Sequence, residues 1–160
     1  LAKSKYKCER LDFVEVNPFR KKSLEDLDIA NNIYDHESLQ ANFNNLKKSY
    51  NYVFTACSIF QTHKDGIKLL ENGGAINFFG GLPKPSPSLE LITNELHYRE
   101  LILTGSHGST PSQHKRAVQI IKENQSFFKS LITNRFPLED ISQAFQFASS
   151  GKGIKVIIKP

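Results

Sequence analysis

The residues of this chain that could do chemistry lie in short segments at the ends of apolar runs. One is a lone acid and three are segments of small or glycine-rich residues: Glu15, Thr55-Ala56-Cys57, Phe79-Gly80-Gly81 and Gly105-Ser106-His107. In an open parallel sheet, ligands bind beyond the carboxyl ends of the strands. If the apolar runs are parallel strands, these segments are candidates for binding a nucleotide.

Glu15 has the side chain and the position needed to bind the ribose of an adenosine. A carboxylate at a strand end can accept hydrogen bonds from both ribose hydroxyls, and it repels a 2′-phosphate. NAD would therefore be favoured over NADP. The alternative is a glutamate at a strand end that only meets solvent.

The other strand-end segments offer space and exposed backbone. Thr55, Ala56 and Cys57 are small enough to leave room for an adenine or a ribose. The pair Gly80-Gly81 permits close approach to the main chain, although a plain turn explains two glycines equally well. Cys57 has no His or Asn partner near it in the sequence, so we interpret it as a small buried hydrophobe, not as a nucleophile.

The histidines do not form a metal-binding pattern. They are scattered, with no H-x-x-x-H spacing and no cysteine beside them: His36, His63, His97, His107 and His114. No zinc site can be built from ligands that are close in sequence. We therefore predict no metal ligand in this chain, and we single out no catalytic residue.

Apolar runs alternate with amphipathic stretches along the sequence, which is typical of a parallel sheet with crossover helices. The chain is therefore predicted to be α/β. The expected strands are Leu11–Val16, Ala30–Tyr34, Tyr52–Cys57, Ala75–Phe79, Leu101–Thr104 and Ile154–Ile158.

Two helices have clear start signals. Asn17-Pro18 supplies an N-cap and a first-turn proline for a helix to about Leu27. Thr110 and Gln113 form a capping box around Pro111, which predicts a helix to about Lys122. Three further helices are predicted with less definite ends: one at about 38–48, one that ends at Gly73-Gly74, and one at about 138–149. Residues 82–88 are expected to form a loop.

Composition limits the classes of protein to consider. With 160 residues, of which 39% are hydrophobic, the chain can form one core, and we expect one domain. The net charge is +5, but the Lys and Arg residues are interleaved with Asp and Glu along the chain, so no nucleic-acid partner is expected. The two cysteines form no C-x-x-C pair, which favours a reducing, cytoplasmic setting. No apolar run has the length of a bilayer span or of a signal peptide, so no membrane partner is expected.

Four segments together resemble a known family: Asn77–Pro83, Thr104–Pro111, Arg135–Ile141 and Gly151–Ile158. They are similar to the back half of zinc-type medium-chain alcohol and polyol dehydrogenases. The resemblance covers residues 1–160 and starts partway into the nucleotide-binding domain. It implies a Rossmann-type, doubly wound parallel sheet that lacks its first strand and glycine-rich turn. The chain would then be a partial NAD-binding domain with a C-terminal helix and strand, without the N-terminal catalytic zinc domain.

The resemblance also implies roles for individual residues. Glu15 falls at the family's acidic position, and Arg20 matches an arginine that packs near the adenine. Lys155 matches a basic residue that reaches the pyrophosphate. The segments 79–81 and 105–107 would offer main-chain groups to the nicotinamide carboxamide. For Arg20 and Lys155 the alternative is an ordinary surface charge.

The activity implied is an oxidoreductase that moves hydride between a secondary alcohol and NAD. The alcohol would be a polyol or sugar alcohol, free or phosphorylated. In the family, zinc polarises the alcohol and is held by the N-terminal domain. We therefore expect zinc in the complete enzyme, no zinc ligand here, and no hydride transfer by this chain alone. The strand at Leu101–Thr104 would pair with its copy in a second subunit, which implies a homo-oligomer.

The start of the sequence predicts an incomplete sheet. Leu1–Cys8 is similar to the end of the helix that should follow the glycine-rich turn. Without the central strand, its neighbours would have unpaired backbone groups and exposed apolar side chains. We therefore expect that the functional protein is longer at its N-terminal end, or that a segment from elsewhere fills the gap.

Two other functions remain open. The chain could be a non-catalytic nucleotide-binding or dimerisation module that has the fold without the zinc domain. It could also be a different doubly wound enzyme such as a methyltransferase, which places an acid at the end of its second strand. The segments at Phe79–Gly81 and Gly151–Lys155 count against the methyltransferase.

Overall fold

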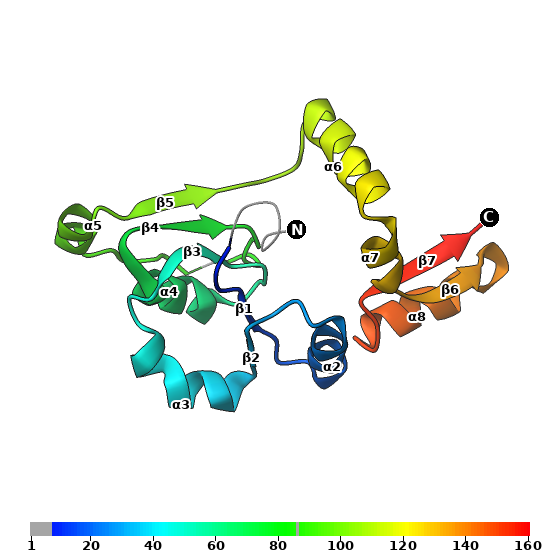
Figure 1. The fold of residues 1–160 in the computed structure, drawn as a ribbon. Coiled ribbons are helices and arrows are strands. Elements are labelled where there is room, and N and C mark those ends of the chain that lie inside the picture. Colours follow the sequence, from blue (N-terminus) through cyan, green and yellow to red (C-terminus); the bar gives the residue numbers. More distant parts are fainter. Residues whose placement is uncertain (1–7, 86) are drawn as a thin grey trace. The chain divides into compact units, whose positions relative to one another are not determined.

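The computed structural model describes residues 8–85 and 87–160, and every strand pair in this part of the chain is parallel (Figure 1). The predicted α/β class is confirmed. The expected helix end at the start of the chain falls, except for Cys8, outside the described residues. The chain divides into two compact units. The central unit is Asn42–Ser109, and the terminal unit joins the residues up to Ala41 with Thr110–Pro160.

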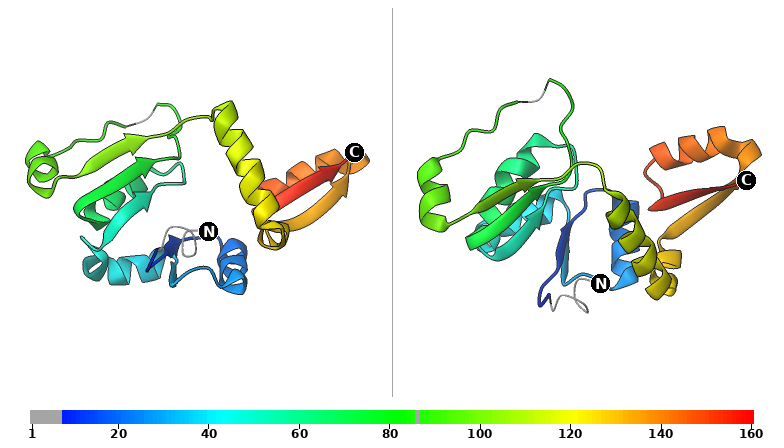
Figure 2. Two further views of the ribbon diagram at one scale, coloured as in Figure 1. Left: turned by 45° about the horizontal axis from the view of Figure 1, so that its top comes forward. Right: turned by 90° about the horizontal axis from the view of Figure 1, so that it is seen from above.

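The central unit contains a sheet in the order β3-β4-β5. Its strands are β3 (Tyr50–Phe54), β4 (Leu70–Phe78) and β5 (Ile102–Gly105), and its helices are α4 (Phe60–Leu69) and α5 (Thr93–Arg99). Two further views show the three strands lying side by side (Figure 2). Helix α4 packs on β3 and β4.

The core of the central unit lies between α4 and the sheet. Ile67, Leu70 and Ile76 are buried together, with Leu70 and Ile76 0% exposed. Gly66 permits this contact, since a Cβ at that position would lie 2.7 Å from Ile76 Cδ1. Leu70 and Ile76 of β4 thus pack beside Ile67 of the helix.

The terminal unit contains two separate pairs of strands. In its first part, β1 (Asp12–Val14) pairs with β2 (Asn32–Tyr34), and α2 (Pro18–Leu27) connects them. In its last part, β6 (Ile132–Pro137) pairs with β7 (Lys155–Lys159). The remaining helices are α3 (His36–Leu46), which crosses the boundary of the units, α6 (Pro111–Glu123), α7 (Gln125–Ser130), η1 (Leu138–Asp140) and α8 (Ile141–Ser149).

Both predicted helix starts are confirmed. The Asn17 side chain accepts hydrogen bonds from the backbone N–H groups of Phe19 and Arg20, at 3.0 and 3.1 Å, and α2 begins at Pro18. Thr110 and Gln113 make both bonds of the capping box at the start of α6. These signals were predictable because cap and partner are no more than three residues apart.

The predicted end of α4 is wrong. The helix ends at Leu69, and Gly73-Gly74 lie inside β4 instead of capping a helix. Leu70 already pairs with Tyr50, and the register shifts between Tyr50 and Tyr52. The glycines allow this shift: Gly73 has a φ of 76°, and a Cβ at Gly74 would lie 3.1 Å from Tyr50 O.

The sequence analysis missed several elements and misplaced one. Neither α5, α7 nor β6 was predicted. The closing strand β7 pairs with β6 in a two-stranded sheet of its own and does not extend β3-β4-β5. In β6, half-buried residues alternate with exposed ones: Ile132, Asn134 and Phe136 are half-buried, and Thr133, Arg135 and Pro137 are exposed. The strand therefore lacks the apolar run that marked the other strands.

The expected open strand edges are present within each unit. Among the described residues, β1 is bonded only to β2, and β3 only to β4. Their apolar side chains are exposed: Val14 by 51%, Tyr52 by 70% and Phe54 by 67%. Such edges are usually covered or paired in folded proteins.

Candidate functional site

The carboxyl ends of β3, β4 and β5 form one edge of the central sheet (Figure 1). The register places Phe54 beside Asn77, and Asn77 beside Thr104. Because the strands are parallel, the segments that follow them leave the sheet at the same edge. The predicted segments 55–57, 79–81 and 105–107 are therefore brought together.

The segment after β4 rests directly on the segment after β3. Gly80 N donates to Thr55 O at 2.7 Å. A Cβ at Gly80 would lie 2.5 Å from Cys57 O and 2.8 Å from Cys57 N, so only glycine fits this position. Next to it, Gly81 has no atom within 4 Å of where its Cβ would lie. Gly80 is thus required by packing, whereas Gly81 leaves open space.

Thr55, Ala56 and Cys57 differ in their access to a ligand. Thr55 is buried and 4% exposed, and its hydroxyl donates to Asn77 O at 3.4 Å. Ala56 is exposed, and Cys57 is half-buried with its Sγ 3.3 Å from Thr62 Oγ1. A ligand at this edge would therefore meet Ala56 and the backbone, not the Thr55 side chain.

A polar network missed by the sequence analysis holds the segment after β5. Asn77 Nδ2 donates to Thr104 Oγ1 at 3.1 Å, and Ser106 Oγ donates to Asn77 Oδ1 at 3.0 Å. Thr104 Oγ1 in turn donates to Ile76 O at 3.0 Å. The Asn77 side chain thereby positions the exposed segment Gly105–His107. A polar residue within an apolar strand was the signal available in the sequence.

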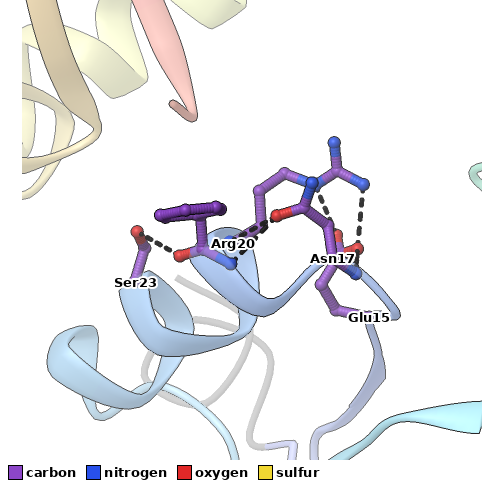
Figure 3. Close-up of polar contacts among 5 residues, drawn as sticks. Glu15, Asn17, Arg20 and Ser23 are labelled. Atoms are coloured by element: carbon purple, nitrogen blue, oxygen red, sulfur yellow. Dashed lines mark hydrogen bonds and ion pairs between the residues drawn. The ribbon is translucent and has the colours of Figure 1, made fainter. Parts of the chain in front are cut away.

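In the terminal unit, Glu15 and Arg20 form a bidentate ion pair (Figure 3). Arg20 Nε lies 2.8 Å from Glu15 Oε2, and Arg20 Nη2 lies 2.8 Å from Oε1. The backbone N–H of Asn17 donates to Oε1 at 2.9 Å. Glu15 directly follows the last residue of β1, and Arg20 lies in the first turn of α2. The turn between them brings the two side chains together.

This pair shifts the proton affinities of both groups. The hydrogen bond from Arg20 lowers the pKa of the Glu15 carboxyl, and burial opposes part of that effect. The bond to Glu15 raises the pKa of the Arg20 guanidinium. Glu15 is therefore ionised at neutral pH, as an acceptor of hydroxyl hydrogen bonds must be.

Lys152, which the sequence analysis did not single out, lies near the start of α2. Gly151 has a φ of 70°, and a Cβ there would lie 2.6 Å from Asn17 Nδ2. Lys152 Nζ lies 6.0 Å from the centre of the Phe19 ring. The predicted Lys155 is exposed on β7, beside Ile132, and no described contact joins it to Glu15 or Arg20.

The described residues contain neither a cluster of metal ligands nor a membrane-spanning helix. No group of three or more His, Cys, Asp or Glu side chains in residues 8–85 and 87–160 could hold a metal ion. In the same residues, no helix combines the length and the apolar character needed to cross a bilayer.

Known proteins of similar sequence are dehydrogenases and reductases. D-xylulose reductase A of Aspergillus oryzae is 31% identical over 120 residues, which are 73% of this chain and 32% of the relative. L-threonine 3-dehydrogenase of Bacillus subtilis is 30% identical over 96 residues, 59% of this chain and 27% of the relative. The resemblance to zinc-type alcohol and polyol dehydrogenases that the sequence predicted is thereby confirmed. No family model matches it.

Structural comparison supports the same fold. An alcohol dehydrogenase from Thermotoga maritima superposes with a TM-score of 0.82 at 22% identity, covering 96% of this chain and 44% of that one. The Rossmann-type α/β fold expected of a medium-chain dehydrogenase is thus confirmed. The chain spans about a third of the length of the curated relatives it matches: 31%, 28% and 27% for three of them.

Proposed function

We propose that this chain binds NAD as part of a cytoplasmic medium-chain dehydrogenase. The observation that carries the proposal is the meeting of three strand-end segments at the carboxyl edge of β3-β4-β5. There, Gly80 lies against the Cys57 backbone, and Asn77 holds Ser106. Such an edge is where nucleotides bind in open parallel sheets.

In this proposal each group of residues has its own task. Glu15 accepts hydrogen bonds from the adenosine ribose, Arg20 lies near the adenine, and Lys155 faces the pyrophosphate. The segment around Ala56 leaves room for the adenine or ribose, and the exposed backbone around Gly81 and Gly105–His107 orients the nicotinamide. The chain binds and orients, while bound nicotinamide supplies the hydride chemistry.

The substrate class proposed is a small secondary alcohol, such as a polyol or sugar alcohol. Its support is the likeness to a D-xylulose reductase and an L-threonine 3-dehydrogenase. The described residues do not fit a zinc site. We therefore attribute to this chain the cofactor side of the reaction and no step at the alcohol.

The test is calorimetric binding of NAD and NADP to the complete protein that carries this chain. We expect NAD to bind about tenfold tighter or more, since the Glu15 carboxylate repels a 2′-phosphate. Glu15→Ala should weaken the binding of NAD and reduce the difference in affinity between NAD and NADP. Glu25→Ala, which removes an exposed acid of α2, should change neither affinity. Equal affinities, or no effect of Glu15→Ala, would contradict the role given to Glu15.

The second candidate is a dimerisation module without catalytic activity. It is favoured by the outer edge of β5, which has no bonded neighbour in the described chain. Ile102 of β5 is 54% exposed. A dimer that binds neither NAD nor NADP would support this candidate over the dehydrogenase.

A further inference from the structure

His63 is a buried polar residue next to the end of β4. It lies in the first turn of α4 and is 8% exposed, and its Nε2 has no hydrogen-bond partner among the described residues. A buried polar atom without a partner costs free energy, so an apolar side chain would suit this position better. The stability of the fold therefore does not explain why an imidazole stands here.

The His63 ring packs on the ring of Phe78. The two ring centres are 4.8 Å apart, and the ring planes are inclined by 39°. Phe78 is the last residue of β4, directly before the segment Phe79–Gly81 at the carboxyl edge of the sheet. Ring pairs at this separation favour particular relative orientations. The His63 ring therefore restricts the direction in which the chain leaves β4.

The residue before His63 contacts the segment that follows β3. Thr62 Oγ1 lies 3.3 Å from Cys57 Sγ. Gly80 in turn lies against the Cys57 backbone, where a Cβ would be 2.5 Å from Cys57 O. Helix α4 packs on both strands from which these segments leave (Figure 1). Two adjacent residues of α4 thus contact the end of β4 and the segment after β3.

We propose that His63 is a positioning residue for the cofactor: its ring holds Phe78, and through it the backbone of Phe79–Gly81, in the arrangement that binds the nicotinamide. The proposal rests on the proposed function, since it assumes that this segment binds NAD. When only a fraction of the molecules has the binding arrangement, the apparent affinity falls by that fraction. Removing the ring therefore weakens NAD binding without weakening the fold.

The experiment measures NAD affinity by calorimetry and stability by urea unfolding, in the complete protein that carries this chain. The variants are His63→Leu, His63→Phe, Phe78→Leu and the double variant with Leu at both positions. Leu removes the ring and its nitrogens together, whereas Phe removes the nitrogens and keeps a ring. The control is Gln61→Leu, at an exposed residue of the same turn whose side chain donates to Asp65 Oδ1 at 2.9 Å.

We expect His63→Leu to weaken NAD binding about threefold to tenfold, as the loss of one ring contact would. Urea unfolding should show this variant to be at least as stable as the wild type, because the unpartnered nitrogen is gone. A purely structural residue would not lower affinity while raising stability. His63→Phe should retain the affinity of the wild type, and Gln61→Leu should change neither quantity.

The double variant tests whether His63 acts through Phe78. Two residues that act through one shared contact have non-additive effects. The double variant should therefore bind NAD no more weakly than Phe78→Leu alone.

Two outcomes would overturn different claims. If His63→Leu binds NAD as tightly as the wild type, or if its effect adds fully to that of Phe78→Leu, the positioning role is wrong, although the proposed function stands. If the wild-type protein binds neither NAD nor NADP, the proposed function itself is wrong.

Discussion

At the scale of single residues, two adjacent glycines differ in whether the fold requires them. Gly80 and Gly81 are adjacent and identical in sequence, yet a Cβ would meet the Cys57 backbone at one and empty space at the other. Backbone atoms cannot move aside as the end of a flexible side chain can. Only the first glycine is therefore required by the fold.

We expect Gly80→Ala to lower the free energy of unfolding by about 1–3 kcal/mol, because the added methyl overpacks against Cys57. Gly81→Ala should change it by less than about 0.5 kcal/mol. Urea denaturation of the two variants beside the wild type makes the comparison. Equal effects at the two positions would show that the contact with Cys57 is not restrictive.

His63 is a polar residue in an apolar setting. It is 8% exposed, its ring lies 4.8 Å from that of Phe78, and its Nε2 has no hydrogen-bond partner. Since an unsatisfied buried group is costly, His63→Leu should raise the free energy of unfolding by roughly 1 kcal/mol. The control His97→Leu, at an exposed position on α5, should have little effect. A destabilised His63→Leu variant would indicate that Nε2 does have a partner.

At the scale of elements, helix α2 depends on the turn that precedes it. Asn17 caps its backbone, and Glu15 binds both Asn17 N and the Arg20 side chain. Three contacts within six residues thus set the direction in which α2 leaves β1. The ionisation of Glu15 should therefore influence how firmly α2 is held.

Arg20 holds the pKa of Glu15 below its ordinary value of 4.5. A folded-state pKa below the unfolded one stabilises the fold above about pH 4.5, and this contribution is lost as pH falls through the folded pKa. We expect the difference in unfolding free energy between wild type and Glu15→Gln to be largest near neutral pH. It should shrink progressively below pH 4.5 in urea titrations.

Asp35 also makes the stability of both proteins depend on pH. Its pKa is also lowered, chiefly by the hydrogen bond from Lys21, so both proteins lose this second contribution in acid. Only the difference between them reports Glu15. A difference that stays constant from neutral pH into acid would mean that the Glu15 carboxylate contributes nothing to stability.

At the scale of the whole molecule, the outer edge of β5 predicts association. A parallel strand with one unbonded side can pair with its copy in a second chain. We expect the protein to sediment as a dimer, and Ile102→Lys to shift it toward monomer by placing a charge at that edge. Val118→Lys, at a similarly exposed apolar residue of α6, should leave the dimer intact. A monomer at every concentration would exclude pairing through β5.

The alternation of apolar runs and helices, the caps at Asn17 and Thr110, and the strand-end positions of the candidate site could all be determined from the sequence alone. Each depends on side chains a few residues apart or on burial that repeats along an element. The likeness to the medium-chain dehydrogenases likewise came from short motifs.

Only the tertiary structure decided which of these segments meet. The contact of Gly80 with Cys57, the hydrogen bond from Ser106 to Asn77 and the pairing of β6 with β7 join residues 22 to 29 positions apart. Such contacts depend on how strands align, which no local pattern specifies. Even the nearby Glu15 and Arg20 were assigned separate roles until the turn between them showed that they bind each other.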